Sequence, residues 1–227
     1  MSSKSQHFPS LIRLILSPFL KLLYRKYAKE IQSYTFLDLE IEIFPGVFPP
    51  RFFYSTKALL KYLVKQDLKN HTFLELGAGS GLISLYAAKI GAIVTASDIS
   101  KTAVKNVMHN ADKHKLKINV IHSDLFMNIK KQQFDWIIIN PPFYSKTPEQ
   151  ETDFAWYCGE NFEFFQSLFS NISEYIHETS KVLLALSDTT SIANIIKIAG
   201  ENKLIATIVY SQRHILENIY IFQINKF

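Results

Sequence analysis

The stretch that decides the fold is Thr72-Phe73-Leu74-Glu75-Leu76-Gly77-Ala78-Gly79-Ser80-Gly81-Leu82. A short apolar run ends in three glycines within five positions, and an apolar helical pattern follows over 82–90. Glycine allows positive φ and lets a ligand approach the backbone without a Cβ in the way. The N-terminus of the following helix offers unpaired N–H groups. The stretch therefore predicts a strand, a tight loop and a helix, with a structural turn or a ligand cradle as the two interpretations of the loop.

The same alternation continues along the chain. Strands are predicted at 93–98, 117–124, 134–140 and 181–187, with helices between them, including one capped by Ser100 that runs to about residue 113. Segments 204–210 and 218–224 end the chain as an antiparallel pair. Strands that alternate with helices indicate an α/β, doubly wound, mostly parallel sheet with helices on both faces.

Acidic residues follow two consecutive predicted strands. Asp98 ends the strand after the glycine loop, and Asp124 ends the next one in His122-Ser123-Asp124-Leu125. The carboxyl ends of the strands form the edge at which open α/β sheets bind ligands. A carboxylate accepts hydrogen bonds without donating, which suits a ribose diol. Each aspartate alone is typical of a turn, but both beside the glycine loop favour a nucleoside site.

The fourth strand ends in Asn140-Pro141-Pro142-Phe143-Tyr144. The two prolines stiffen the chain and remove two backbone donors. The Asn140 amide and the Pro141 carbonyl can then hold the two hydrogens of a planar amino group, and Phe143 or Tyr144 can stack on a flat acceptor. Such positioning supplies much of the rate of a methyl transfer.

Together these residues resemble the class I S-adenosylmethionine-dependent methyltransferases, over about residues 34–227. The resemblance implies a Rossmann-like, seven-stranded sheet with the last strand antiparallel, and S-adenosylmethionine as cofactor. It places Glu75 near the methionine amino end, and Asp98 with Ile99 at the ribose. The remaining implied cofactor contacts are the loop residues Gly77, Ala78, Gly79 and Gly81, the adenine contacts Asp124 and Leu125, and Asn140.

The NPPFY motif resembles that of the branch that methylates amide or amino nitrogens, with Asn140, Pro141, Phe143 and Tyr144 as its catalytic residues. The implied acceptor is a macromolecule, either a protein glutamine or a nucleic-acid base. Phe143 stands where glutamine and adenine enzymes more often have tyrosine. Phe154, Trp156 and Tyr157 are expected to form either a lid or plain core packing.

Two other functions fit parts of this pattern. A nicotinamide-dependent oxidoreductase would carry Gly-x-Gly-x-x-Gly, but position 82 is leucine. A non-catalytic scaffold could keep the pocket without the chemistry. Cofactor titration separates the first from a methyltransferase, and the substitution Asn140→Ala separates the second.

Composition and charge bound the rest. The one cysteine, Cys158, excludes an intrachain disulfide and is expected to be buried. The scattered histidines favour no metal site, and the absence of a long apolar run favours a soluble, cytoplasmic protein. Hydrophobic residues make up 48% of the chain, enough for a sizeable core.

The net charge of +5 belongs to the N-terminal segment. Residues 1–33 hold six basic groups and one acidic, whereas the other 194 residues hold 19 of each. Residues 8–29 are predicted to form amphipathic helices interrupted at Pro18, which would pack on the body or contact a membrane surface or an acidic partner. We therefore expect a helical extension at 1–33 and a methyltransferase domain at 34–227. That domain is expected to open with one half-buried strand at 34–44, and 56–66 to be helical.

Overall fold

The computed structural model describes residues 30–227 except 53 and 216, so the helices predicted within 8–29 lie outside the described residues. The elements, in chain order, are β1 (Gln32–Phe36), β2 (Leu39–Ile43), η1 (Pro50–Phe52), α2 (Tyr54–Leu63), β3 (Thr72–Leu76), α3 (Leu82–Lys89), β4 (Ile93–Asp98), α4 (Lys101–Lys113), β5 (Ile118–His122), β6 (Trp136–Ile139), η2 (Glu151–Ala155), α5 (Glu163–Ile172), β7 (Lys181–Ser187), α6 (Ile192–Glu201), β8 (Leu204–Arg213) and β9 (Asn218–Lys226).

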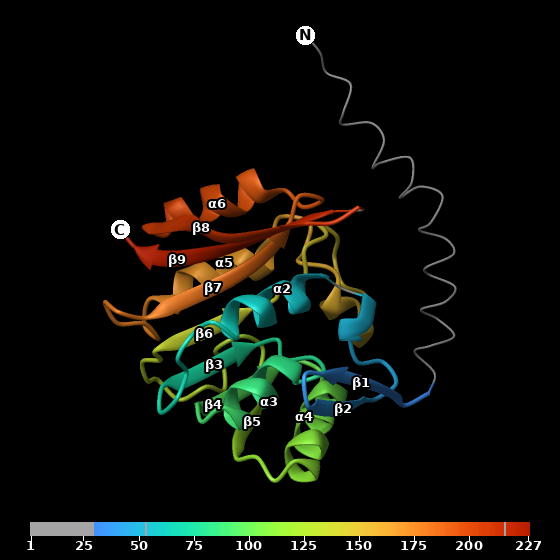
Figure 1. The fold of residues 1–227 in the computed structure, drawn as a ribbon. Helices are drawn as coiled ribbons and strands as arrows, with labels where there is room; N and C mark the ends of the chain where they lie inside the picture. Colours follow the sequence, from blue (N-terminus) through green and yellow to red (C-terminus); the bar gives the residue numbers. More distant parts are fainter. Residues whose placement is uncertain (1–29, 53, 216) are drawn as a thin grey trace.

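Seven strands form the central sheet in the order β5-β4-β3-β6-β7-β9-β8 (Figure 1). β9 pairs antiparallel with β7 and β8, and the other neighbouring pairs are parallel. The predicted doubly wound sheet with an antiparallel last strand is thereby confirmed. The sequence order changes direction between β3 and β6, which places a ligand crevice at their carboxyl ends.

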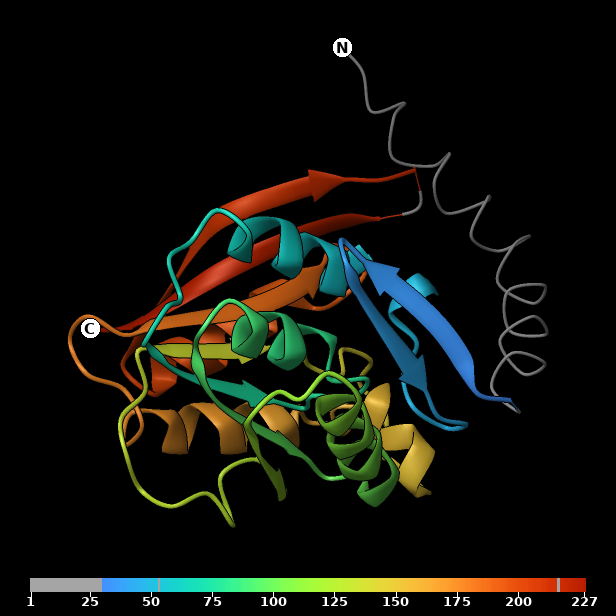
Figure 2. The same ribbon diagram turned by 60° about the horizontal axis from the view of Figure 1, so that its bottom comes forward.

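Both faces of the sheet are buried. The four residues of β6 are all buried, and Trp136 and Ile138 join one core while Ile137 and Ile139 join the other. Helices α2 and α3 cover the first face, and α5 and α6 cover the second (Figure 2). Because side chains alternate along a strand, an unbroken apolar run fits a strand covered on both sides.

The predicted single strand at 34–44 is wrong. The structure has a hairpin there, in which β1 pairs antiparallel with β2 around a turn at Leu37, whose φ is +52°. The alternation itself is correct on the second strand, where Leu39, Ile41 and Ile43 are buried. The sequence does not mark the turn, because it lacks the Asn-Gly or Asp-Gly signal of a tight hairpin.

Two buried asparagines of α4 attach this hairpin to the body. Asn110 receives a hydrogen bond from the Glu42 backbone N–H and donates to its carbonyl. Asn106 receives one from the Phe44 N–H and donates to the carbonyls of Glu42 and Ser80. Ser80 belongs to the glycine loop, so Asn106 of α4 connects the hairpin to that loop.

The remaining boundaries differ little from those predicted. The helix expected between the strands at 134–140 and 181–187 is α5, Glu163–Ile172, and β1 begins at Gln32, before the predicted domain start at 34. Among the described residues, no helix is long and apolar enough to cross a membrane. The same residues contain no cluster of three or more His, Cys, Asp or Glu side chains that could hold a metal ion.

Candidate active site

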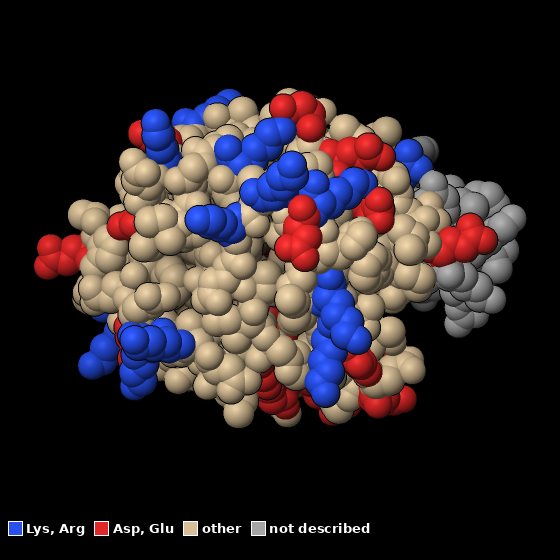
Figure 3. Space-filling view, turned by 90° about the horizontal axis from the view of Figure 1, so that it is seen from below, with Lys and Arg blue, Asp and Glu red and all other residues tan. Residues whose placement is uncertain are grey.

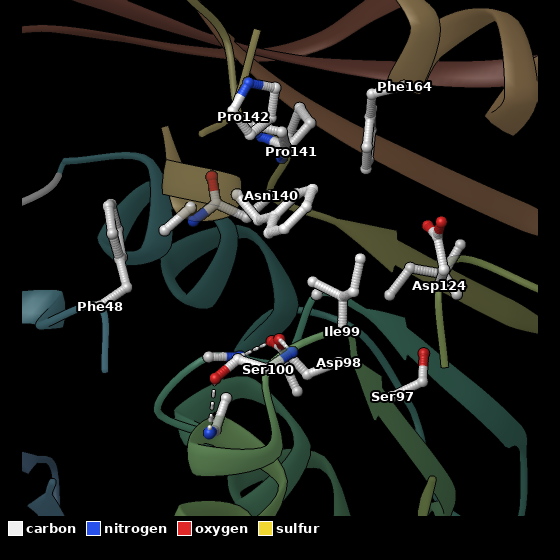
Figure 4. A pocket seen from close by; sticks show the side chains of 18 of the residues that line it. Phe48, Ser97, Asp98, Ile99, Ser100, Asp124, Asn140, Pro141, Pro142 and Phe164 are labelled. Atoms are coloured by element: carbon white, nitrogen blue, oxygen red, sulfur yellow. Dashed lines mark hydrogen bonds between the residues drawn. The ribbon is translucent and has the colours of Figure 1, made fainter. Parts of the chain in front are cut away.

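A cavity of about 710 Å³ lies at the carboxyl ends of β3, β4, β5 and β6 (Figure 4). Its volume is in the range of sites for small ligands. Segments 45–48 and 147–159 complete its walls. The predicted site residues that line it are Glu75, Gly77, Ala78, Gly79, Asp98, Ile99, Asp124, Leu125, Asn140, Pro141 and Phe143. Gly81 and Tyr144, also predicted, are not part of the lining.

The glycines of the loop have different tasks. All three have positive φ, +73° at Gly77, +53° at Gly79 and +77° at Gly81. A Cβ on Gly77 would have no neighbour within 4 Å, whereas a Cβ on Gly81 would lie 2.9 Å from Val107 Cγ2. Gly77 therefore leaves space at the cavity, and Gly81 lets α3 begin against α4.

Glu75 is a buried carboxyl on the cavity wall. Its Oε2 accepts hydrogen bonds from the Ser84 N–H, at 2.8 Å, and from the Ser84 hydroxyl, in the first turn of α3. Burial raises its pKa to about 8, and the Ser84 bonds oppose that rise. The site thus holds an acid that is largely neutral until a cation comes near.

Asp98 is fixed by the backbone on two sides. One carboxylate oxygen accepts from the Gly79 N–H and the other from the Ser100 N–H, each at 2.8 Å (Figure 4). Burial raises its pKa, and these two bonds oppose the rise. Ser100 caps α4 as predicted, accepting from the Ala103 N–H at 3.3 Å. The carboxylate is therefore held rigidly beside the glycine loop.

The third strand end contributes the loop of Ser123, Asp124 and Leu125. Ser123 Oγ donates to the Leu125 carbonyl at 2.9 Å and accepts from the Asn128 N–H at 3.0 Å. Leu125 has a φ of +43°, an uncommon conformation for a leucine that fixes the loop at the cavity edge. Phe164 of α5 also lines the cavity. The sequence does not predict it, since an aromatic residue on a helix has no signal that separates it from core packing.

Asn140 is the most informative side chain of the site. Its Nδ2 donates to Thr56 Oγ1 at 3.1 Å, and its Oδ1 is buried without a hydrogen-bond partner among the described residues. Thr56 belongs to α2, is buried and also lines the cavity. The amide is therefore held by its nitrogen, while a strong acceptor is left unsatisfied, which is costly unless a ligand donor fills it.

The segment after the proline pair forms the outer wall. Tyr144 and Trp156 are joined by a backbone hydrogen bond, and Tyr144 forms a bridge with Tyr157. Trp156 packs edge-on against Phe48 with ring centroids 5.3 Å apart. Cys158 is buried at the cavity, as expected. The sequence predicts either a lid or core packing for Phe154, Trp156 and Tyr157. Phe154 and Tyr157 line the cavity, whereas Trp156 packs on the opposite loop.

Sequence and fold comparisons agree with this geometry. The model of the methyltransferase small domain family matches residues 38–157. A Methanocaldococcus jannaschii protein assigned as an N5-glutamine methyltransferase is 37% identical over 116 residues, 51% of this chain and 56% of its own length. A tRNA (adenine-N6) methyltransferase of Shewanella loihica is 30% identical over 149 residues, 59% of this chain and 58% of its own. The chain therefore spans little more than half the length of either relative.

A solved structure shares the fold. The T. thermophilus 16S rRNA N2 methyltransferase, determined with AdoMet and guanosine, aligns with a TM-score of 0.62 and 20% identity, over 87% of this chain and 50% of its own. Fold and cavity define an α/β domain with a ligand crevice at the carboxyl edge of its sheet. The chain belongs to the methyltransferase small domain family. The predicted resemblance to methyltransferases is thereby confirmed at the level of the family.

Proposed function

We propose that the protein transfers a methyl group from S-adenosylmethionine to an amide or exocyclic amino nitrogen of a macromolecule. The single observation that carries the proposal is the Oδ1 of Asn140, a residue of the cavity lining. This oxygen is buried and has no hydrogen-bond partner among the described residues. It can accept a hydrogen bond from an N–H group, and a planar amino group has such an N–H. The names of the relatives, which include a protein glutamine and a tRNA adenine enzyme, support this acceptor class.

The residues present fit the cofactor. Gly77 leaves open backbone at the cavity, Asp98 offers a fixed carboxylate for a diol, and Glu75 offers a buried acid for an amino group. Asp124, Leu125 and Phe164 line the same cavity and would hold the flat base. When bound, the cofactor supplies an electrophilic methyl group on a sulfonium.

The chain's own part in the reaction is orientation. Thr56 fixes the Asn140 amide, and Asn140 Oδ1 with the Pro141 carbonyl would each accept one N–H of the acceptor. Phe143, on the cavity wall, would stack on its plane. The acceptor's lone pair would then point along one line toward the methyl group.

The test is the substitution Asn140→Ala. Transfer of labelled methyl into cell-extract macromolecules should fall by at least about a hundredfold, because the acceptor loses its alignment. Affinity for S-adenosylhomocysteine should be nearly unchanged. Transfer at the original rate would refute the acceptor geometry. Tight binding of a nicotinamide dinucleotide instead of S-adenosylhomocysteine would refute the cofactor, and with it the methyltransferase proposal.

Three expectations stay predictions. They are the cytosolic location, the parts of Gly81 in cofactor binding and of Tyr144 in catalysis, and a contact of residues 8–29 with a membrane or an acidic partner.

A further inference from the structure

The charges of the described body are unevenly placed. On the face seen in Figure 3, basic and acidic side chains lie interspersed. The segment from 43 to 66, by contrast, contains Arg51, Lys57, Lys61 and Lys65 and no Asp or Glu. The segment from 202 to 216, which includes β8, likewise has no acidic residue, and it ends near Arg213 and His214. These two segments lie together, because α2 contacts β8 and β9.

We call Arg51, Lys57, Lys61, Lys65, Arg213 and His214 the α2 basic face. Tyr54 at the start of α2 stacks on His214 with ring centroids 3.7 Å apart. Lys57 Nζ lies 5.8 Å from the Tyr54 ring centroid and donates to the Arg51 carbonyl at 3.1 Å. Tyr54, Lys57 and Lys61 follow the three- and four-residue steps of one helix face. Tyr54 and His214 therefore join the basic residues of α2 to the residue that follows β8.

The basic side chains of this face act on one another. Burial lowers the pKa of His214, and the charges of Lys61 and Lys57 lower it further. Burial also lowers the pKa of Lys57, with further lowering by Arg51 and Lys61. The acids that follow these two segments have other hydrogen-bond partners. Asp67, two positions after Lys65, accepts from the Lys69 N–H at 3.0 Å. Glu217, three positions after His214, accepts from the Ser187 hydroxyl at 2.6 Å. The positive charges of Arg51, Lys57 and Lys61 thus lie close enough to repel one another, and an anion bound there would relieve this repulsion.

The α2 basic face leads to the acceptor end of the cavity. Thr56, which holds Asn140, lies on α2 between Tyr54 and Lys57. Successive turns of α2 carry Lys57 and Lys61 away from the cavity in steps of about 6 Å. An extended anionic chain lying on these lysines would reach the cavity with its next unit.

We propose that the methyl acceptor is a base in single-stranded nucleic acid, whose phosphates lie along the α2 basic face. The proposal rests on the proposed function, since it names the acceptor class of the same site. Cations interleaved with aromatic rings are the composition with which proteins bind single strands. An exocyclic base amine is planar and fits the unpartnered Oδ1 of Asn140.

The test uses the full chain and short single-stranded RNA and DNA oligonucleotides of one sequence. The variant K57Q/K61Q should bind the preferred strand roughly tenfold more weakly at moderate salt, and the slope of log affinity against log salt should fall by about 1.4. The matched control is K117Q/K130Q, an equal charge change at exposed positions flanking β5, the opposite edge of the sheet. It should bind within about twofold of the original protein. The RNA and DNA arms decide which nucleic acid is bound.

Three results would overturn the nucleic-acid acceptor: no oligonucleotide binding, equal losses in both variants, or an acidic peptide bound as tightly as the strand. S-adenosylhomocysteine titration of each variant keeps these outcomes separate from the fate of the proposed function. Normal cofactor affinity without oligonucleotide binding would refute only the proposal that the acceptor is a nucleic acid. Absence of cofactor affinity in the original protein removes the methyltransferase proposal itself.

Discussion

Thr56 is a positioning residue for the proposed reaction, because it contacts the Asn140 amide at 3.1 Å. Replacing it with the isosteric valine removes that partner and lets the amide rotate. We expect Thr56→Val to lower kcat by roughly tenfold, the value of about one hydrogen bond, while KM for the cofactor stays unchanged. Steady-state methyl transfer measures both constants.

The conservative variant Thr56→Ser keeps the hydroxyl and should restore most of kcat. A purely structural role would instead lower the thermal stability of the valine variant with no selective effect on kcat. Equal kcat in all three proteins would contradict the role of Thr56.

Glu75 gives the site a pH dependence. Burial raises its pKa to about 8, so at neutral pH the carboxyl of the free protein is mostly protonated. A cationic amino group beside it favours the carboxylate, so cofactor binding should release protons, and affinity should weaken by up to about tenfold per pH unit below 8. Calorimetry with S-adenosylhomocysteine in two buffers of different ionisation enthalpy measures the release. Glu75→Gln should bind more weakly, with this release lost; an unchanged release in that variant would assign the proton elsewhere.

Some residues of the site could be predicted from the sequence pattern, and others could not. Glu75, Asp98 and Asn140 could be predicted, since polar residues at the ends of apolar strands meet at one sheet edge. Thr56 is 84 positions from Asn140 and lies in a helix whose buried face gives it no distinguishing pattern. Its role depends on tertiary packing alone, which is why only the structure revealed it.

At the scale of elements, Gly81 joins α3 to α4. Its φ is +77°, and a Cβ added there would lie only 2.9 Å from Val107 Cγ2, so Gly81→Ala should carry two separate penalties. Together they should lower the free energy of unfolding by roughly 2 to 4 kcal/mol. Urea denaturation followed by circular dichroism measures the change.

The double variant Gly81→Ala/Val107→Ala separates the two penalties. It removes the crowding but keeps the strained backbone, so the glycine substitution should cost less in the Val107→Ala background. Equal costs in both backgrounds would show that crowding contributes nothing.

The hairpin β1–β2 shows where element prediction fails. An alternating pattern predicts which side chains of a strand are buried, and Leu39, Ile41 and Ile43 are. It does not mark a reversal when the turn residue is an ordinary one such as Leu37. Nor does it reveal that Asn106 and Asn110, buried in α4, hold the backbone of β2. Polar residues within a helix are typical of a solvated face, and their burial here depends on the hairpin beside them.

At the scale of the whole molecule, alternation of strands and helices predicts a doubly wound sheet but leaves the spatial order of strands open. The pattern predicts the final antiparallel pair, 204–210 with 218–224, but not its place in the sheet, where β9 lies between β7 and β8. The order matters for function, because it is the step from β3 to β6 that opens the crevice in which Glu75 and Asn140 meet.

The body that carries the cavity should not need residues 1–29. Among the described residues, those that line the cavity all lie between 45 and 167, and β1 begins at Gln32. A protein that begins at Glu30 keeps that strand whole, whereas one that begins at Tyr34, the predicted boundary, loses two residues of its pairing with β2. We therefore expect the first truncation to bind S-adenosylhomocysteine as the full chain does and the second to unfold at a lower temperature. Calorimetric titration and thermal denaturation of the two proteins test this, and loss of cofactor affinity in the protein that begins at Glu30 would show that the N-terminal segment is part of the site.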